Sequence, residues 1–298
     1  MERVRVWVWI SLLFLSLGAV ACGAPPADEP ADPAGDTTEP TTSADQPEDP
    51  AAAYARAIEE AHGLDAWSSK DAVSARIQLT FGGNQALDGR MIFAPDMTKA
   101  RLDQGEASVI WDGETAWVTP ADAEFPRARF HVLTWPYFLA APMKLRDPGT
   151  RLELLGAKAV DAELHDAARL TFEEGVGDTP DDWYVLYRDP RTNRLEAMAY
   201  VVTYGTRLED ANQEPHAIVY DDFQEVEGVM IPTTWEFRLW SEEKAGIYGD
   251  PLGQAKLSDV RFVTPGEGTF QGPDDAREVT LPQPTPADSE GPETSEES

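Results

Sequence analysis

The alternation of apolar and polar residues along the chain predicts a mainly antiparallel β protein. In "VSARIQLTF", residues 73–81, every second side chain is apolar and those between are polar, which is typical of a strand with one face in water. "GRMIFAP" and "TKARLDQ" predict the strands that follow. "SVIWDGETAWV" predicts a hairpin, because Asp112 and Gly113 form a tight-turn pair between two apolar runs.

The second half of the chain repeats the hairpin pattern. "WYVLYRDPRTNRLEAMAYVVTYG" predicts two strands around a turn at residues 189–193. "HAIVYDDFQEVEGVMIPTTWEFRLW" predicts another pair that turns at Glu227 and Gly228, and "AKLSDVRFV" supplies a last strand. Together these segments predict roughly ten antiparallel strands.

One clear helix precedes the strands. In "DPAAAYARAIEEAHGLDAW", Asp49 can cap a helix that has Pro50 in its first turn. Tyr54, Ile58 and Ala61 then form an apolar stripe at helical spacing. A single amphipathic helix beside many antiparallel strands predicts an α+β protein whose curved sheet wraps on the helix, and not a doubly wound α/β fold.

A short aromatic segment, "WPYFLAAPMKLRDPGT", contrasts with the rest of this acidic chain. Pro136 suits a first helical turn, whereas Trp135 before it and Pro142 after it oppose a longer helix. The spacing therefore predicts about one and a half helical turns, too short to cross a membrane. The "DPG" sequence at residues 147–149 then predicts a turn back into the sheet.

The N-terminal sequence predicts export and lipid anchoring. Residues 1–21 combine two arginines with an apolar run shorter than the roughly 20 residues that cross a bilayer, which indicates a lipoprotein signal peptide. Cys22, the only cysteine, follows "AVA" as in a bacterial lipobox, although Ala19 stands where leucine is usual. A chance cysteine after an ordinary signal peptide is the alternative. Gly23, with no aspartate there, resembles lipoproteins that are sent to an outer membrane.

Composition divides the rest of the chain into a folded part and two acidic tails. Residues 22–52 and 273–298 are rich in proline and acidic residues and poor in large apolar ones, so they predict a disordered tether and a disordered tail. Residues 53–272 form the predicted domain, which is long enough for one core. The chain has a net charge of −30, and this domain alone has 37 acidic and 21 basic residues. Nucleic acid and anionic lipid surfaces are therefore not expected as partners.

The order of these elements resembles the LolA/LolB-like lipoprotein-localisation superfamily. "YFLAAPMKLRDPGT", "DDWYVLYRDPRTNRLEAMAYVV", "WDGETAW" and "EVEGVMIPTTWEF" are also similar to stretches of an uncharacterised family of secreted bacterial lipoproteins within or near that group. The resemblance implies a curved open half-barrel over a hydrophobic cavity that binds acyl chains, with Trp135–Thr150 as a short helical lid. Soluble carriers of this kind are not lipidated, so the predicted anchor indicates an acceptor or an anchored lipid-binding relative.

Common catalytic and metal-binding motifs are missing from the sequence. We find no nucleophile elbow, zinc-binding helix, P-loop, paired cysteine motif or EF-hand loop. The four histidines lie far apart, and His62 is expected to cap the end of the first helix. The adjacent carboxylates at 181–182 and 221–222 are expected to be solvated at strand ends, not to act as acid and base or to bind calcium. We therefore predict no catalytic residue, metal or cofactor.

Aromatic residues provide the remaining indication of a site. Large aromatic side chains supply apolar area together with a polar group, which suits a cavity wall, although plain core packing is the alternative for each of them. The predicted ligand-binding residues are Trp117, Trp135, Tyr137, Phe138, Met143, Trp183, Tyr187, Tyr200 and Trp235.

We therefore expect a non-enzymatic lipoprotein of the cell envelope, anchored in the outer membrane and facing the periplasm. Its half-barrel would bind an acyl chain, a lipid or another hydrophobic small molecule, driven by apolar burial at about 25 cal/mol per Å². An envelope sensor or protein-interaction module with the same fold and no bound ligand is the alternative. A hydrolase would need a nucleophile with a base in reach, and the spacing suggests none.

Overall fold

The computed structural model describes residues 48–282. The predicted signal peptide, Cys22 and the tether up to residue 47 lie outside the described residues, as does the tail from residue 283. The helical elements are α1 (Pro50–His62), α2 (Leu64–Ser68), α3 (Ala128–Ala140), the 3-10 turn η1 (Ala141–Met143) and α4 (Leu208–Ala211). The strands are β1 (Ala72–Phe81), β2 (Asn84–Phe93), β3 (Ala100–Gln104), β4 (Ala107–Trp111), β5 (Ala116–Thr119), β6 (Thr150–Val160), β7 (Glu163–Phe172), β8 (Tyr184–Arg188), β9 (Leu195–Tyr200), β10 (His216–Val226), β11 (Val229–Ser241), β12 (Gly246–Val263) and β13 (Arg277–Val279).

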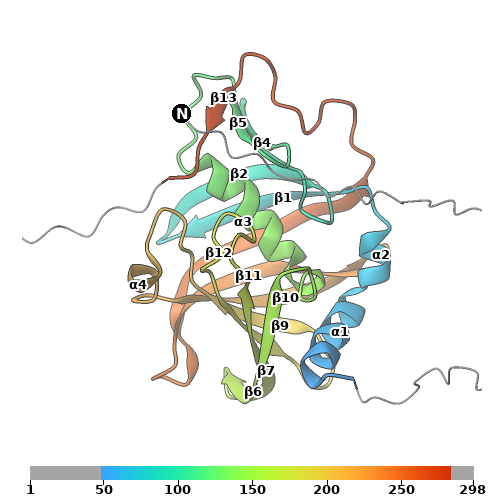
Figure 1. Ribbon diagram of the computed structural model, residues 1–298, viewed down its shortest axis with the longest axis vertical. Helices are drawn as coiled ribbons and strands as arrows, with labels where there is room; N and C mark the ends of the chain where they lie inside the picture. Colours follow the sequence, from blue (N-terminus) through green and yellow to red (C-terminus); the bar gives the residue numbers. More distant parts are fainter. Residues whose placement is uncertain (1–47, 283–298) are drawn as a thin grey trace, which may run out of the picture. The chain divides into compact units, whose positions relative to one another are not determined.

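The strands form one sheet in the order β11-β10-β9-β8-β7-β6-β12-β1-β2-β3-β4-β5-β13. Because β11 also pairs with β12, the strands from β6 to β12 make a partial ring, and the others extend from β12 as an open wing (Figure 1). The predicted α+β class with an open, mainly antiparallel half-barrel is confirmed. The sheet has 13 strands and not roughly ten.

Strand β1 shows how the sequence gives the sheet one buried face and one exposed face. Ile77 and Leu79 are buried, whereas Arg76, Gln78 and Thr80 between them are exposed, as the alternation predicts. The predicted hairpins β4–β5, β8–β9 and β10–β11 all form.

Helix α1 begins where the sequence places it. The Asp49 carboxylate accepts the backbone N–H of Ala51 at 3.1 Å, and Gly63 ends the helix in the left-handed conformation. The buried face is formed by Tyr54, Ala55, Ile58, Glu59 and His62. This face is more polar than the predicted stripe, because it includes Glu59 and His62 and not Ala61.

Helix α3 corrects the prediction of a one-and-a-half-turn piece. It has 13 residues and contains Pro136 in its interior, while Pro142 lies in η1. Buried side chains lie on most sides of α3, including Val132, Trp135 and Leu139, so tertiary packing offsets the lost backbone hydrogen bond. No helix within residues 48–282 is long and apolar enough to cross a membrane.

Helix α3 lies across the sheet and contacts both parts of it (Figure 1). On one side it packs on β2 to β5. On the other side the Tyr220 hydroxyl of β10 donates to the Phe138 carbonyl at 2.8 Å, and the Trp135 ring meets Phe237 of β11 with centroids 6.2 Å apart. The helix therefore covers the open side of the half-barrel.

Both predicted ends of the domain need correction. Residues 50–52 belong to α1 and not to the tether. Residues 277–279, predicted as disordered tail, form β13 and pair with β5. Arg277 strengthens this edge by donating to the carbonyl groups of Ala121 and Ala123.

Candidate functional site: an apolar pocket beside α3

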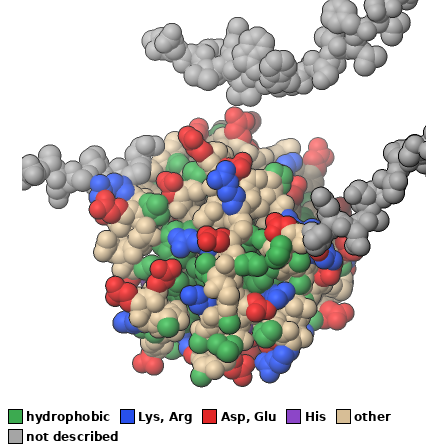
Figure 2. Space-filling view, turned by 60° about the horizontal axis from the view of Figure 1, so that its bottom comes forward, with side chains coloured by type: hydrophobic (Ala, Val, Ile, Leu, Met, Phe, Trp, Pro, Cys, Tyr) green, Lys and Arg blue, Asp and Glu red, His purple; other side chains and the backbone are tan. Residues whose placement is uncertain are grey.

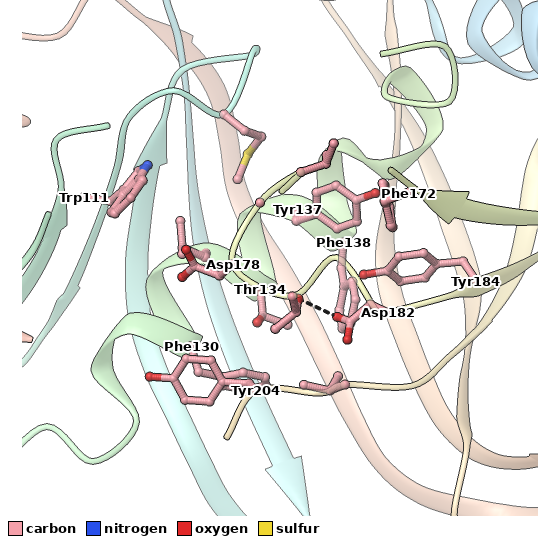
Figure 3. Close-up of a pocket in the computed structure, with 16 residues that line it drawn as sticks. Trp111, Phe130, Thr134, Tyr137, Phe138, Phe172, Asp178, Asp182, Tyr184 and Tyr204 are labelled. Carbon is pink, nitrogen blue, oxygen red and sulfur yellow. Dashed lines mark hydrogen bonds between the residues drawn. The ribbon is translucent and has the colours of Figure 1, made fainter. Parts of the chain in front are cut away.

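A pocket of about 270 Å³ lies between α3 and the loops that follow β7 and β9 (Figure 3). Its walls combine aromatic and aliphatic side chains with a few polar groups, the composition that is typical of small-molecule sites. The lining residues are Met97, Trp111, Phe130, Leu133, Thr134, Tyr137, Phe138, Phe172, Val176, Gly177, Asp178, Thr179, Asp182, Tyr184, Val202 and Tyr204.

An ion pair fixes the β7–β8 loop over α3. The Arg129 guanidinium donates two hydrogen bonds to the Asp178 carboxylate, at 2.5 and 2.7 Å, and its cationic centre lies 4.6 Å from the centre of the Trp111 ring. Both charged side chains are partly buried, so this bidentate pair is better placed than an ordinary surface pair. The charge of Asp178 is therefore compensated at the pocket.

Asp182 joins the two loops that border the pocket. One carboxylate oxygen accepts the backbone N–H and the hydroxyl of Thr203, both at 2.7 Å, and the other accepts the Thr179 hydroxyl at 2.8 Å (Figure 3). Burial raises the pKa of Asp182, while these hydrogen bonds oppose the rise. This corrects the expectation of a solvated Asp181–Asp182 pair, because Asp182 is buried and structural.

Two tyrosines pack against each other in the wall of the pocket. Tyr137 from α3 and Tyr184 from β8 have ring centroids 5.7 Å apart, and Phe172 packs edge-on against Tyr184. Burial raises the pKa of Tyr184 well above its usual value, and Tyr137 and Asp182 add to the rise. Burial raises the pKa of Tyr137 as well. Both phenols are therefore protonated hydrogen-bond donors at neutral pH.

A second pocket of about 410 Å³ adjoins the first on the other side of Phe130, Phe138 and Val202, which line both. In this pocket the Trp135 indole N–H donates to Nδ1 of His131 at 2.9 Å. This bond requires an unprotonated Nδ1, and burial, helped by Arg127, lowers the pKa of His131 to about 4. His131 is thus a neutral packing partner, and no carboxylate within residues 48–282 forms a hydrogen bond with it.

The predicted site residues on the concave face divide among several environments. Tyr137 and Phe138 line the first pocket, and Trp135 and Tyr200 line the second. Met143 borders a third, more polar hollow beneath α1 and α2. The remaining residue, Trp235, is fully buried in the main core and lines none of these pockets.

The structure places Trp183 and Tyr187 on the opposite face of the sheet. They belong to a second hydrophobic cluster with Trp240, whose indole N–H donates to the Tyr187 hydroxyl at 2.7 Å. Since neighbouring residues of a strand point to opposite faces, Tyr184 faces the pocket and Tyr187 does not. Trp183 and Tyr187 therefore line none of the three pockets.

Trp117 also lies away from the pocket. Its neighbours in β5, Ala116 and Val118, are buried in the sheet, whereas the Trp117 indole N–H donates to the Asp112 carboxylate at 2.9 Å. Its ring packs closely against Gly272. Trp117 thus stabilises the β4–β5 hairpin and the segment before β13.

His62 does not cap its helix as expected. Its side chain is completely buried, Nε2 accepts the backbone N–H of Leu195 at 3.0 Å, and Nδ1 lies 3.0 Å from the Met230 carbonyl. Because a backbone N–H can only donate, the proton resides on Nδ1 and is donated to Met230. Within residues 48–282 no three histidine, cysteine or acidic side chains gather closely enough to hold a metal ion.

Several lining residues escaped the sequence prediction, notably Phe130, Phe172 and Tyr184. Phe130 lies in a helix turn that was not predicted. Tyr184 lies in the apolar run "WYVLY", where both faces of the strand are buried. Alternation alone could have shown that Tyr184 and Tyr187 face opposite sides, but not which side contains the pocket.

The fold and pocket define an open antiparallel half-barrel with an apolar site beneath a helix. Residues 129–231 match the model of a family of unknown function, DUF6503. The matched segment contains most of the pocket walls and less than half of the chain. A search of curated proteins finds no match to this sequence.

Among solved structures, the chain is similar to a LolA superfamily protein from Nitrosomonas europaea, with 12% identity, coverage of 73% of this chain and 97% of that chain, and a TM-score of 0.48. A DUF1329 family protein from Desulfovibrio piger has 12% identity, coverage of 75% and 98%, and a TM-score of 0.46. A domain from Vibrio parahaemolyticus, assigned as an outer membrane lipoprotein-sorting protein, has 11% identity, coverage of 73% and 97%, and a TM-score of 0.44. The chain is thus similar, at low sequence identity, to a LolA superfamily protein and to a lipoprotein-sorting protein domain.

Proposed function

We propose that the domain binds a hydrophobic small molecule, such as an acyl chain or a lipid, in the pocket beside α3. The observation that carries this proposal is the pocket itself, about 270 Å³ between α3 and the sheet, with mostly aromatic and aliphatic walls. An acyl chain that buries roughly 300 Å² of its surface would gain on the order of 7 kcal/mol. Such binding needs no ion pair.

The described surface supports a pocket ligand better than a large protein-docking face. The large hydrophobic side chains exposed within residues 48–282 are Leu154, Leu164 and Leu208. On the face shown in Figure 2, acidic and basic side chains are interspersed among small hydrophobic patches. Scattered apolar residues of this kind are normal on a protein surface.

Native mass spectrometry of the chain extracted from its own membrane tests the proposal. We expect a bound apolar mass, and we expect purified protein to increase the fluorescence of N-phenyl-1-naphthylamine. Thr134→Phe should reduce this binding because Thr134 lines the pocket, whereas Thr80→Phe, on the exposed side of β1, should not. Ligand-free protein with no dye binding would refute the proposal.

We also propose that the domain is not an enzyme. Two of its histidines support this view, because His62 is held by backbone groups and His131 accepts from Trp135, so neither is paired with a nucleophile. A fatty-acid ester incubated with the protein should be recovered intact, as measured by mass spectrometry. Hydrolysis that scales with protein concentration would contradict the proposal.

The lipid anchor remains a prediction of the sequence, and we propose that Cys22 attaches the chain to the outer membrane facing the periplasm. Wild-type protein should incorporate labelled palmitate and fractionate with that membrane. Cys22→Ala should abolish both. Incorporation that persists in Cys22→Ala would show that the anchor lies elsewhere.

A further inference from the structure

The hydroxyl groups of Tyr137 and Tyr184 differ from those of Tyr54 and Tyr220, which are bonded to backbone carbonyl groups. The Tyr220 hydroxyl donates to the Phe138 carbonyl at 2.8 Å, and the Tyr54 hydroxyl lies 3.2 Å from the Leu186 carbonyl. Within residues 48–282, by contrast, no group forms a hydrogen bond with the hydroxyl of Tyr137 or Tyr184. Neither oxygen is among the buried side-chain atoms that lack a partner, so both hydroxyls are accessible in the pocket and free to donate to water or to a ligand.

Both side chains border the same space. Tyr137 comes from α3 and Tyr184 from β8, and both line the apolar pocket (Figure 3). Their ring centroids are 5.7 Å apart, and Phe138 and Phe172 form neighbouring parts of the wall. A polar atom of a ligand that enters this space can therefore meet two phenol donors in apolar surroundings.

The charges of the pocket disfavour an anionic ligand. Its described lining contains two acidic residues, Asp178 and Asp182, and no lysine, arginine or histidine. Arg129 lies just outside this lining and is already paired with Asp178 through two hydrogen bonds. A carboxylate in the pocket would lose its hydration, meet the charge of Asp182 and find no free cation.

The acidic residues do not offer a binding site for a cation either. Asp178 is neutralised by Arg129, and both oxygens of Asp182 accept hydrogen bonds from Thr179 and Thr203. The groups left for recognition are hydroxyls that can donate, those of Tyr137, Tyr184, Thr134 and Tyr204. Their natural partner is an uncharged acceptor.

We propose that the pocket selects an uncharged hydrophobic ligand that contains a hydrogen-bond acceptor, such as the carbonyl of a fatty-acid ester, and that Tyr137 and Tyr184 donate to it. This inference rests on the proposed function and names its ligand class. Free fatty-acid anions bind more weakly, although they have the same chain. When the wrong ligand leaves the donors of a site unpaired, the site discriminates against that ligand more strongly than it could by shape alone.

Displacement of N-phenyl-1-naphthylamine from the full chain at pH 8 tests the inference with two matched competitors, methyl laurate and laurate. Both have the same chain, and they differ in the charge of the head group. We expect methyl laurate to bind at least tenfold more tightly than laurate. Equal or tighter binding of laurate, or of dodecyltrimethylammonium, would overturn the inference while leaving the proposed function intact.

Tyr137→Phe and Tyr184→Phe test the role of the hydroxyls. Each should weaken methyl laurate binding by roughly threefold to tenfold, the value of one neutral hydrogen bond, with little change for the dye. Neither should destabilise the ligand-free protein, because the hydroxyl has no protein partner to lose. Unchanged ester affinity in both variants would overturn the assignment.

Tyr187→Phe is the matched control. Tyr187 lies in the same strand as Tyr184 but on the other face, where its hydroxyl accepts from Trp240. This variant should lose stability and keep the preference for the ester. If neither the wild-type protein nor any variant binds the dye or a competitor, the proposed function itself fails. If the protein binds them without preferring the ester, only the inferred ligand class fails.

Discussion

Protonation of His62 should destabilise the domain in mild acid. The imidazole is completely buried. Its Nε2 accepts the Leu195 N–H at 3.0 Å, and its Nδ1–H donates to the Met230 carbonyl at 3.0 Å. Burial lowers the pKa of His62 from 6.5 to about 4. A charged ring would lose its acceptor function at Nε2 and would place a proton against a backbone N–H.

The sign and size of the effect follow from linkage. Since the pKa is lower in the folded state than in the unfolded state, the unfolded chain binds the extra proton between about pH 6.5 and pH 4. Stability is therefore fully present above that window and is lost as the pH falls through it. The separation of the two pKa values corresponds to about 3 kcal/mol, a large part of the stability of an ordinary domain.

Urea unfolding of wild type and His62→Gln at pH 7.5 and pH 4.5 isolates this contribution. Glutamine is a suitable replacement because it keeps one donor and one acceptor. Other groups titrate in the same range, so the quantity of interest is the difference between the two proteins. Wild type should lose about 2–3 kcal/mol more than the variant between the two pH values. Parallel losses in both proteins would refute the role assigned to His62.

Three further substitutions test the packing. Gly63→Ala should destabilise strongly or prevent folding, because an added Cβ would lie 2.1 Å from the Gly228 carbonyl oxygen and Gly63 has a φ of 82°; the yield of folded protein and its thermal midpoint measure this. Arg146→Met leaves the buried Glu59 carboxylate without its ion pair, and burial raises the pKa of Glu59. The loss in the free energy of unfolding relative to wild type should therefore be largest at neutral pH and should shrink as the pH falls and Glu59 is protonated. Phe138→Ala should cost about 3–5 kcal/mol in urea unfolding, because Phe138 is 2% exposed within the main core; a loss below 1 kcal/mol would show that it belongs only to a ligand cover.

The hairpins could be predicted because their signals are local. The Asp112 carboxylate accepts the backbone N–H groups of Glu114 and Thr115, at 2.9 and 2.8 Å. In a second turn, the Asp189 carboxylate likewise accepts the backbone N–H groups of Arg191 and Thr192. Interactions that span so few residues are visible in the sequence as turn residues between apolar runs.

Helix α3 was predicted too short because its stability is not local. Proline in a helix interior removes a backbone hydrogen bond and is costly in an isolated helix. Here Trp135, the residue before Pro136, contacts Phe237 of β11, and the ring of Phe138, two residues after it, lies 4.9 Å from that of Tyr200. These contacts, distant in the sequence, favour a continuous helix over the break that local rules predict.

The polarity of the pocket also depends on contacts between distant segments. Arg129 and Asp178 are far apart in the sequence, as are Asp182 and Thr203, yet each pair removes a charge or a polar group from possible ligand recognition. Composition alone indicates a strongly acidic protein, but it does not show which carboxylates already have a cation or a hydrogen-bond donor as partner. Once these pairs form, the polar groups that remain in the pocket are uncharged hydroxyls, among them those of Tyr137 and Tyr184. An uncharged acceptor in an apolar ligand therefore fits this site better than the fatty-acid anion that a lipid-binding fold alone would suggest.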